Sequence, residues 1–198
     1  MLAAHDPSTH RRHRGPGAGK TTAIDLFRRE LGPRLVTVPE AATMLLGGGF
    51  PRPSDPPARR AVQLAIYHVQ YNLEAVQLAR YPRRVLLCDR GTIDGAAYWP
   101  GPAQEFFAAV GSSMQAELAR YDEVIFFETA AVGGLSIESG NPARVESNDE
   151  AVVLDARLRE LWSQHPRFTF VAHEPSFLAK ITKGLGKLSE IVDRLAPA

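Results

Sequence analysis

Eight residues near the start of the chain constrain its fold more than any others: Gly-Pro-Gly-Ala-Gly-Lys-Thr-Thr at positions 15–22. The glycines let backbone amides point inward without side-chain clashes, and such a concave run of amides binds anions. A lysine followed by two hydroxyl residues then matches the P-loop, the turn that cradles the phosphates of a nucleotide. Apolar residues at helical spacing follow, so the loop predicts a helix whose N-terminus also favours phosphate.

The pattern assigns a role to each part of this loop. We expect Lys20 to reach the β- and γ-phosphates as a point charge, and Thr21 to place its hydroxyl on Mg²⁺. The loop backbone would hold the remaining phosphate oxygens, so the cofactors expected are ATP and Mg²⁺. The predicted nucleotide-binding residues are Gly15, Gly17, Ala18, Gly19, Lys20, Thr21 and Thr22.

The segment before the loop departs from the pattern. Arg14 stands where the full motif, Gly-x-x-x-x-Gly-Lys-Thr, has its first glycine, and residues 9–14 read Thr-His-Arg-Arg-His-Arg. A P-loop follows a buried strand, which needs apolar residues, and burying an unpaired arginine is costly. We therefore expect residues 1–14 to form a basic N-terminal tail or a defective first strand, and residues 15–198 to form a single domain.

The rest of the chain alternates between strand and helix patterns. Short apolar runs predict strands at 35–38, 84–88, 124–127 and 168–171, and helical patterns follow at 41–46, 59–80, 102–120, 149–164 and 176–195. Residues 92–101 are predicted to form a loop. Because strands alternate with helices, the crossovers should be right-handed and the sheet parallel, with helices on both faces. The fold class predicted is therefore α/β.

Ligands in parallel sheets bind outside the carboxyl ends of the strands, which places Glu40, Asp89, Arg90 and Glu128 on one rim. Asp89 could hold Mg²⁺ through water or accept a proton from an acceptor hydroxyl, and Arg90 could bind phosphate. Glu40 is a second candidate general base. An ordinary strand-end ion pair is the alternative for these residues, and a loop-capping role is the alternative for Asp94.

Two further segments suggest contacts with substrate. Residues 131–148 are rich in Gly, Ser and Asn and predict a mobile lid, in which Arg144 could stabilise a transferring phosphoryl group or remain a solvated charge. On the 59–80 helix, Val62, Ile66, Val69, Leu73 and Val76 predict the core face. The polar residues Gln63, Tyr67, Gln70 and Glu74 lie on a neighbouring face, which either reads an acceptor or is simply solvated.

Composition narrows the class of protein. The net charge of +1 suggests no polyanion-binding surface, and no apolar stretch is long enough to cross a bilayer or to form a signal peptide. The single cysteine, Cys88, rules out a disulfide within the chain. We therefore expect a cytoplasmic enzyme whose partners are a nucleotide and a small-molecule acceptor, without nucleic acid or membrane.

Four motifs carry a resemblance: the P-loop, Pro39-Glu40-Ala41, Asp89-Arg90-Gly91, and a lid arginine before an acid-led helix. From Gly15 to about Val192 the chain resembles the small P-loop ATPase and kinase family, an AAA-type ATPase domain related to ribosylnicotinamide kinase. The Asp-Arg pair is also similar to that of deoxynucleoside and thymidylate kinases. The resemblance implies ATP–Mg²⁺ binding and a three-layer sandwich with a parallel sheet of about five strands.

The leading functional hypothesis is phosphoryl transfer from ATP to a small, nucleoside-like hydroxyl acceptor. Lys20 and Arg144 would stabilise the phosphoryl group, Arg90 would bind phosphate, Thr21 and Asp89 would hold Mg²⁺, and Glu40 or Asp89 would accept the proton. An ATP hydrolase and a nucleotide sensor without turnover are the alternatives. Arg90 occupies the place where machine-type ATPases carry a glutamate, and no Asn-Lys-x-Asp motif of a GTPase is present.

Overall fold

The computed structural model describes residues 20–129, 148–174 and 176–195. The predicted first strand within residues 1–14, the P-loop turn up to Gly19 and the lid with Arg144 lie outside the described residues. The P-loop enters the description only at helix α1 (Lys20–Leu31), which begins at the lysine of the motif and confirms the helix predicted after the loop.

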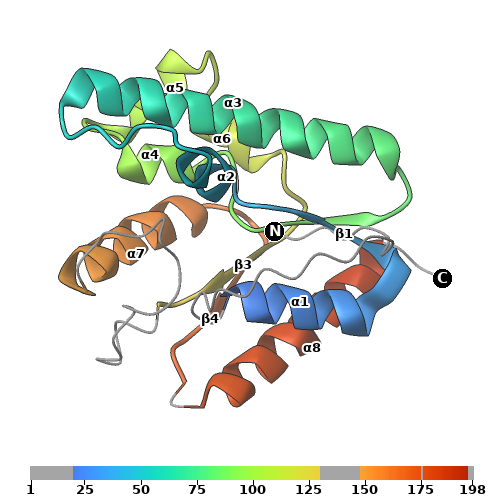
Figure 1. Cartoon of the computed structure of the whole chain (residues 1–198). Coiled ribbons are helices and arrows are strands. Elements are labelled where there is room, and N and C mark those ends of the chain that lie inside the picture. Colours follow the sequence, from blue (N-terminus) through green and yellow to red (C-terminus); the bar gives the residue numbers. More distant parts are fainter. Residues whose placement is uncertain (1–19, 130–147, 175, 196–198) are drawn as a thin grey trace.

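Two pairs of parallel strands run through the centre of the molecule (Figure 1). Strand β1 (Leu35–Val38) pairs with β2 (Val85–Cys88), and β3 (Val124–Phe127) pairs with β4 (Phe168–Val171). Within the described part of the chain, these pairs form two separate two-stranded sheets. The prediction of parallel strands is confirmed, whereas a single sheet of about five strands is not, since the strand expected before the P-loop is not described.

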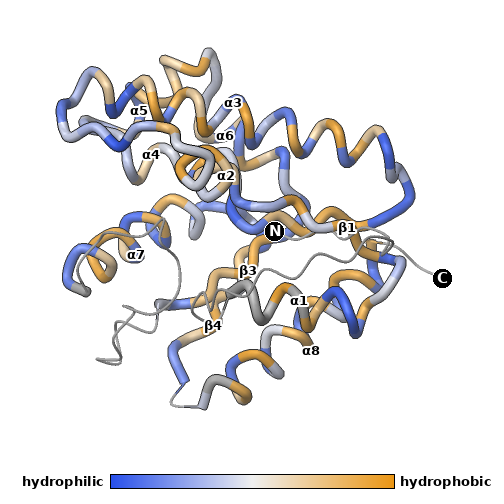
Figure 2. Tube along the Cα trace, viewed as in Figure 1, coloured by the Kyte–Doolittle hydropathy of each residue, from blue (hydrophilic) through white to orange (hydrophobic). Residues whose placement is uncertain are grey.

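The strands form because their residues are apolar and covered on both faces. Leu35, Val36 and Val38 are completely buried, and Phe27 of α1 packs into the same core. Ile181, Leu188 and Val192 come to this core from the last helix, α8 (Phe177–Leu195). In Figure 2 the central strands are coloured as hydrophobic, while the helices alternate between hydrophobic and hydrophilic residues.

Helices cover both sides of the strands, as the α/β prediction requires (Figure 1). Helices α1 and α8 lie together on one side, and the long helix α3 lies on the other and contacts β1 and β2. The Oγ of Ser176 accepts a hydrogen bond from the backbone N of Ala179 over 3.2 Å, so Ser176 caps α8. The other helices are α2 (Ala41–Gly47), α3 (Pro56–Arg80), α4 (Asp94–Tyr98), α5 (Ala103–Ala109), α6 (Met114–Leu118) and α7 (Asn148–Trp162), with a 3₁₀ turn at Gly32–Arg34.

Two predictions of secondary structure are wrong. Residues 92–101 are not only a loop, because they contain α4. Residues 102–120 do not form one helix but two, α5 and α6. The break occurs where Gly111 adopts a φ of +69° and Ser113 caps α6 by accepting a hydrogen bond from the backbone N of Ala116.

The orientation of α3 also differs from the prediction. Val76, which was expected in the core, has 50 % of its surface exposed, whereas Tyr67, Gln70 and Glu74 are buried. The predicted face is therefore wrong at Val76 and right at Val62. Polar residues point inward because α3 packs on the loop after β2 and on α6, which supply hydrogen-bond partners.

The only cysteine, Cys88, ends strand β2 and is 1 % exposed. Burial raises the pKa of its thiol well above the ordinary value, and the nearby carboxylate of Glu74 raises the pKa further. The thiol of Cys88 is therefore protonated at neutral pH.

None of the described helices is both long and apolar enough to cross a bilayer.

Candidate active site at the ends of strands β1 and β2

The carboxyl ends of β1 and β2 meet at one edge of the sheet. The backbone N of Asp89 donates a hydrogen bond to the carbonyl of Val38 over 2.9 Å, so the pairing continues one residue beyond β2. Arg90 follows and reaches back across the edge, with its Nε 3.5 Å from Oε1 of Glu40. Its NH1 lies 3.2 Å from Oδ2 of Asp94. The structure thus brings together Glu40, Arg90 and Asp94, with Asp89 next in the chain.

The backbone of Arg90 adopts a conformation that non-glycine residues rarely take. Its φ is 102°, and such a conformation costs about 1–3 kcal/mol. The next residue must be glycine, because a Cβ on Gly91 would lie 2.7 Å from the ring of Trp162 and 2.9 Å from the hydroxyl of Tyr121. Close packing against these two aromatic residues therefore holds the Asp-Arg-Gly turn in this conformation.

The guanidinium of Arg90 stays charged despite its surroundings. Burial lowers its pKa, but Tyr98, Asp94, Glu40 and Asp89 outweigh burial, so the net pKa lies above the ordinary value. Three carboxylates therefore surround one cation at this edge. A phosphate group could bind Arg90 only by exchanging with one of these carboxylates or by bringing a cation with it.

Glu40 is held by both of its carboxylate oxygens. Oε1 faces Arg90, and Oε2 accepts a hydrogen bond from the Thr43 hydroxyl over 2.5 Å. Glu40 occupies the N-cap position of α2, yet its side chain caps no backbone amide. With 23 % of its side chain exposed, the carboxylate is fixed in position and still open to a ligand, as a general base must be.

Gln70 of α3 connects the ends of both strands. Its Oε1 accepts from the backbone N of Ala41 over 3.2 Å, and its Nε2 donates to the carbonyl of Arg90 over 3.2 Å. Nε2 also donates to Oε1 of Glu74 over 3.1 Å. Only 2 % of Gln70 is exposed, so it lies beneath the edge and supports it. The sequence left open whether Gln70 contacts an acceptor or faces solvent, and in this structure Gln70 does not face solvent.

A second layer of buried polar residues supports the turn from below. Glu74 accepts hydrogen bonds from Arg120 over 2.8 Å and from the Tyr121 hydroxyl over 3.2 Å. Tyr121 in turn accepts from the backbone N of Thr92 over 2.7 Å. Burial raises the pKa of Tyr121 well above the ordinary value, and Glu74 raises it further, so its hydroxyl remains a donor.

Glu117 of α6 completes this layer. Its carboxylate accepts three hydroxyl hydrogen bonds, from Tyr67 over 2.9 Å, from Thr92 over 2.6 Å and from Ser112 over 2.6 Å. Tyr67 was expected to face either an acceptor or solvent, but it is buried and bonded internally. Sequence reasoning missed Thr92, Glu117, Arg120 and Tyr121, because these residues share neither a motif nor a period.

Asp94 bridges two parts of the fold. Its Oδ1 accepts a hydrogen bond from the indole N of Trp162 over 2.6 Å, and its Oδ2 faces Arg90. Asp94 begins α4 and is 8 % exposed. It therefore ties α7 to the Arg90 turn.

Glu128 lies at the end of the other strand pair. Its carboxylate accepts from the backbone N of His173 over 2.8 Å and lies 3.6 Å from Arg159, and its carbonyl accepts from the side chain of Lys180. Burial lowers the pKa of Lys180 from its ordinary value. In the described part of the chain, no hydrogen bond or ion pair joins Glu128 to Glu40 or Arg90, so these predicted rim residues form two groups.

The predicted magnesium ligands are Thr21 and Asp89. No group of three His, Cys, Asp or Glu residues in the described part of the chain is arranged to hold a metal ion. Mg²⁺ in P-loop proteins keeps several waters and binds phosphate oxygens as well as one or two protein oxygens. The carboxylate of Asp89, at the end of β2, is an oxygen ligand of the type that Mg²⁺ prefers, so Asp89 fits the ion, whereas the side chain of Thr21 lies outside the described part of the chain.

Comparison with known proteins gives the family. A model of the AAA domain family matches residues 15–176, which are most of the chain. Neither the search of curated proteins nor the search of solved structures found a significant match. AAA-type P-loop proteins generally bind nucleotide with Mg²⁺. The match begins at the first glycine of the P-loop and includes the parallel strands and the Glu40–Arg90 edge, and the chain therefore belongs to the AAA domain family of P-loop nucleotide-binding proteins.

Proposed function

We propose that the protein transfers the γ-phosphoryl group of ATP to a hydroxyl of a small, nucleoside-like acceptor. The observation that carries this proposal is the fixed position of Glu40. Its carboxylate is held by Arg90 and Thr43 at the edge where ligands of parallel sheets bind, and it remains partly exposed. A carboxylate placed in this way can accept the proton of an attacking hydroxyl.

In the proposed reaction the acceptor oxygen forms a bond to the γ-phosphorus, and the bond between that phosphorus and the β,γ-bridging oxygen breaks. ADP leaves, and the acceptor proton passes to Glu40. Lys20 contacts the β- and γ-phosphates through its ammonium group, and Arg144 stabilises the transferring group. Bound Mg²⁺ would supply charge neutralisation on the phosphates, with Thr21 and Asp89 as its ligands.

Arg90 favours transfer to an acceptor over hydrolysis. Machine-type ATPases place a glutamate directly after the strand-end aspartate to activate water, and here that place holds a guanidinium. The charge of Arg90 can orient an acceptor or a phosphate oxygen, but it cannot take a proton from water. The same edge therefore argues against the hydrolase alternative.

Measuring ADP release from Mg²⁺–ATP, with and without a panel of ribo- and deoxyribonucleosides, tests the proposal. A kinase requires an acceptor for ADP release. Release at the same rate without acceptor would indicate a hydrolase, and ATP binding without any release would indicate a sensor. Either result would overturn the proposal.

The Glu40→Gln variant tests the proposed base. It keeps the contact with Thr43 and removes the ability to accept a proton, so kcat should fall while ATP affinity stays constant. Glu190→Gln is the matched control, because Glu190 is an exposed residue of α8 with 65 % of its side chain exposed. An unchanged kcat in Glu40→Gln would remove Glu40 from the reaction.

A further inference from the structure

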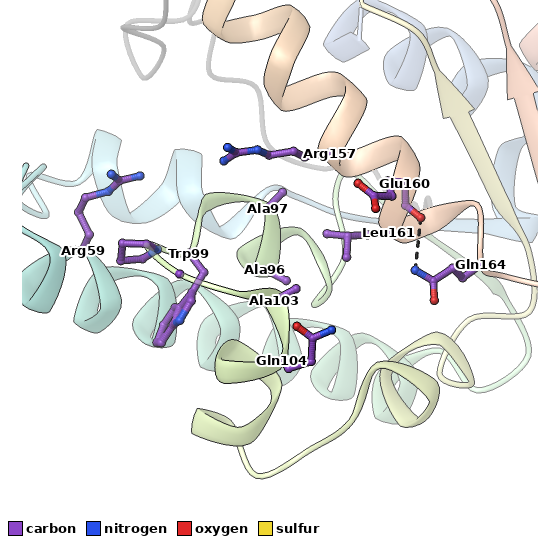
Figure 3. A pocket seen from close by; sticks show the side chains of 12 residues that line it. Arg59, Ala96, Ala97, Trp99, Ala103, Gln104, Arg157, Glu160, Leu161 and Gln164 are labelled. Atoms are coloured by element: carbon purple, nitrogen blue, oxygen red, sulfur yellow. Dashed lines mark hydrogen bonds between the residues drawn. The ribbon is translucent and has the colours of Figure 1, made fainter.

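A cavity of about 570 Å³ lies between α3, the α4–α5 segment and α7 (Figure 3). Its size falls within the range of small-molecule sites, about 300–1,000 Å³. None of Glu40, Gln70, Asp89 or Arg90 lines it, so it is distinct from the candidate active site.

One side of the cavity is apolar. Ala96 and Ala97 of α4, Ala103 of α5 and Leu161 of α7 line it together. The space exists because the three alanines are short where larger side chains would fill the seam between these helices. This wall suits the apolar or aromatic part of a ligand.

The other side of the cavity is cationic. Arg59 of α3 and Arg157 of α7 reach it from different helices (Figure 3). One end of the Arg59 guanidinium is fixed by a hydrogen bond from NH2 to the carbonyl of Tyr98 over 3.3 Å. Among the described residues, Arg157 has no hydrogen-bond or ion-pair partner. Glu160 is the only acidic residue of the lining, so the cavity carries an excess of positive charge.

The neighbouring loop at residues 99–101 is well held, and the charge of Arg60 beside it is paired with Glu105 over 3.4 Å. Arg60 donates to the carbonyl of Pro100 over 3.2 Å, and its guanidinium lies 5.7 Å from the centre of the Trp99 ring. Trp99 packs edge-on against Phe106 and is 6 % exposed. The loop that lines the cavity is therefore fixed without a ligand. Binding would cost little conformational entropy in this loop.

We propose that this cavity binds a small organic anion. Its carboxylate or phosphate pairs with Arg157 and Arg59, and its apolar body lies against Ala96, Ala97 and Leu161. Arginine suits this role because its planar guanidinium pairs with two oxygens of either group. The inference goes beyond the proposed phosphoryl transfer and does not depend on it.

The test is a calorimetric titration of phenyl phosphate into the full-length protein, with ADP and Mg²⁺ present at saturation to occupy the nucleotide site. Phenyl phosphate should bind at one site, and benzyl alcohol, which has no charge, should not. Inorganic phosphate should bind at least fivefold more weakly than phenyl phosphate, because it lacks the apolar body. Benzoate distinguishes the two anion classes: tighter binding than phenyl phosphate indicates a carboxylate ligand, and weaker binding indicates a phosphate.

Two variants locate the site. Arg157→Gln should weaken the binding of phenyl phosphate at least fivefold. Arg83→Gln changes an exposed arginine just beyond the C-terminal end of α3 and should leave the affinity for phenyl phosphate unchanged. Ala97→Leu should also abolish binding by filling the cavity, provided that thermal melting shows a folded protein. Equal affinity in wild type and Arg157→Gln, or equal affinity for phenyl phosphate and inorganic phosphate, would overturn the proposal. If the protein proved to have no kinase activity, the outcome of this titration would not change, because the titration involves no turnover.

Discussion

The indole N of Trp162 donates a hydrogen bond to Oδ1 of Asp94 over 2.6 Å, although the two residues are 68 positions apart in the sequence. The same carboxylate faces Arg90 through its other oxygen. Helix α7 therefore determines where the guanidinium of Arg90 lies, because it holds the carboxylate to which Arg90 is paired. Helix α7 thus supports the Glu40–Arg90 edge in two ways, through this hydrogen bond and through the packing of the Trp162 ring against Gly91.

Replacing Trp162 by phenylalanine should destabilise the protein and impair turnover. The substitution removes a hydrogen bond to a charged group, worth about 1.5–3 kcal/mol, and frees Asp94 to move away from Arg90. Trp99→Phe is the matched control, because Trp99 is equally buried and its indole N has no hydrogen-bond partner among the described residues. Urea unfolding and acceptor-dependent ADP release measure the two effects. Equal losses in both variants would show that the indole hydrogen bond has no special role.

Two truncations of Arg90 can be compared to measure the strain of its backbone. Arg90→Ala and Arg90→Gly both remove the guanidinium and should both abolish turnover. Only glycine relaxes the φ of 102°, so Arg90→Gly should be more stable than Arg90→Ala by about 1 kcal/mol. The midpoint of urea unfolding measures the difference. Two variants of the same stability would mean that the turn is not strained.

Tyr67 should make stability sensitive to alkaline pH. Burial raises the pKa of its hydroxyl, and the hydrogen bond to Glu117 raises it further. In the unfolded chain tyrosine loses its proton at about pH 10, whereas folded Tyr67 keeps its proton there. Its stabilising contribution is therefore present below about pH 10 and is lost as the pH rises.

The variant Tyr67→Phe tests this dependence. Its melting temperature should fall less steeply than that of the wild type between about pH 9 and about pH 11, and at neutral pH it should be about 1 kcal/mol less stable. Tyr71→Phe on the same helix, with 41 % of the residue exposed, should match the wild type. Parallel pH curves for Tyr67→Phe and wild type would contradict the prediction.

Lys20→Ala should abolish turnover and weaken the binding of ATP. Loss of a charged contact with the phosphates is worth about 2 kcal/mol, or roughly thirtyfold in Kd. Arg29→Ala removes an exposed positive charge from the same helix and serves as the control. Calorimetric titration with ATP measures both. Unchanged ATP affinity in Lys20→Ala would contradict the P-loop interpretation of residues 15–22.

The elements of the fold could be predicted wherever the signal is local. The runs around Val36, Leu87, Phe126 and Phe170 are apolar and short, so all four described strands were predicted within one residue of their ends. The position of Glu40 and Arg90 at one edge followed from the parallel arrangement of β1 and β2. The break at Gly111 has a local signal too, since glycine followed by serine ends one helix and caps the next.

The support of the site could not be predicted, because it depends on contacts between distant polar residues. Apolar periodicity assigned the inner face of α3 to Val76, whereas the residues that point inward include Gln70 and Glu74. A polar residue inside a protein looks the same in the sequence as one on the surface, and only its partners distinguish the two. Those partners, such as Tyr121 and Arg120, lie more than 40 residues away.

Because Cys88 is buried, the reactivity of its thiol can report local unfolding around strand β2. A protonated thiol that solvent does not reach cannot react with an alkylating reagent until β2 separates from its neighbours. The rate of alkylation under native conditions therefore reports how often this part of the sheet opens. Because any ligand that binds only the folded state makes opening rarer, the same measurement made over a series of candidate nucleotides ranks them without an assay of activity.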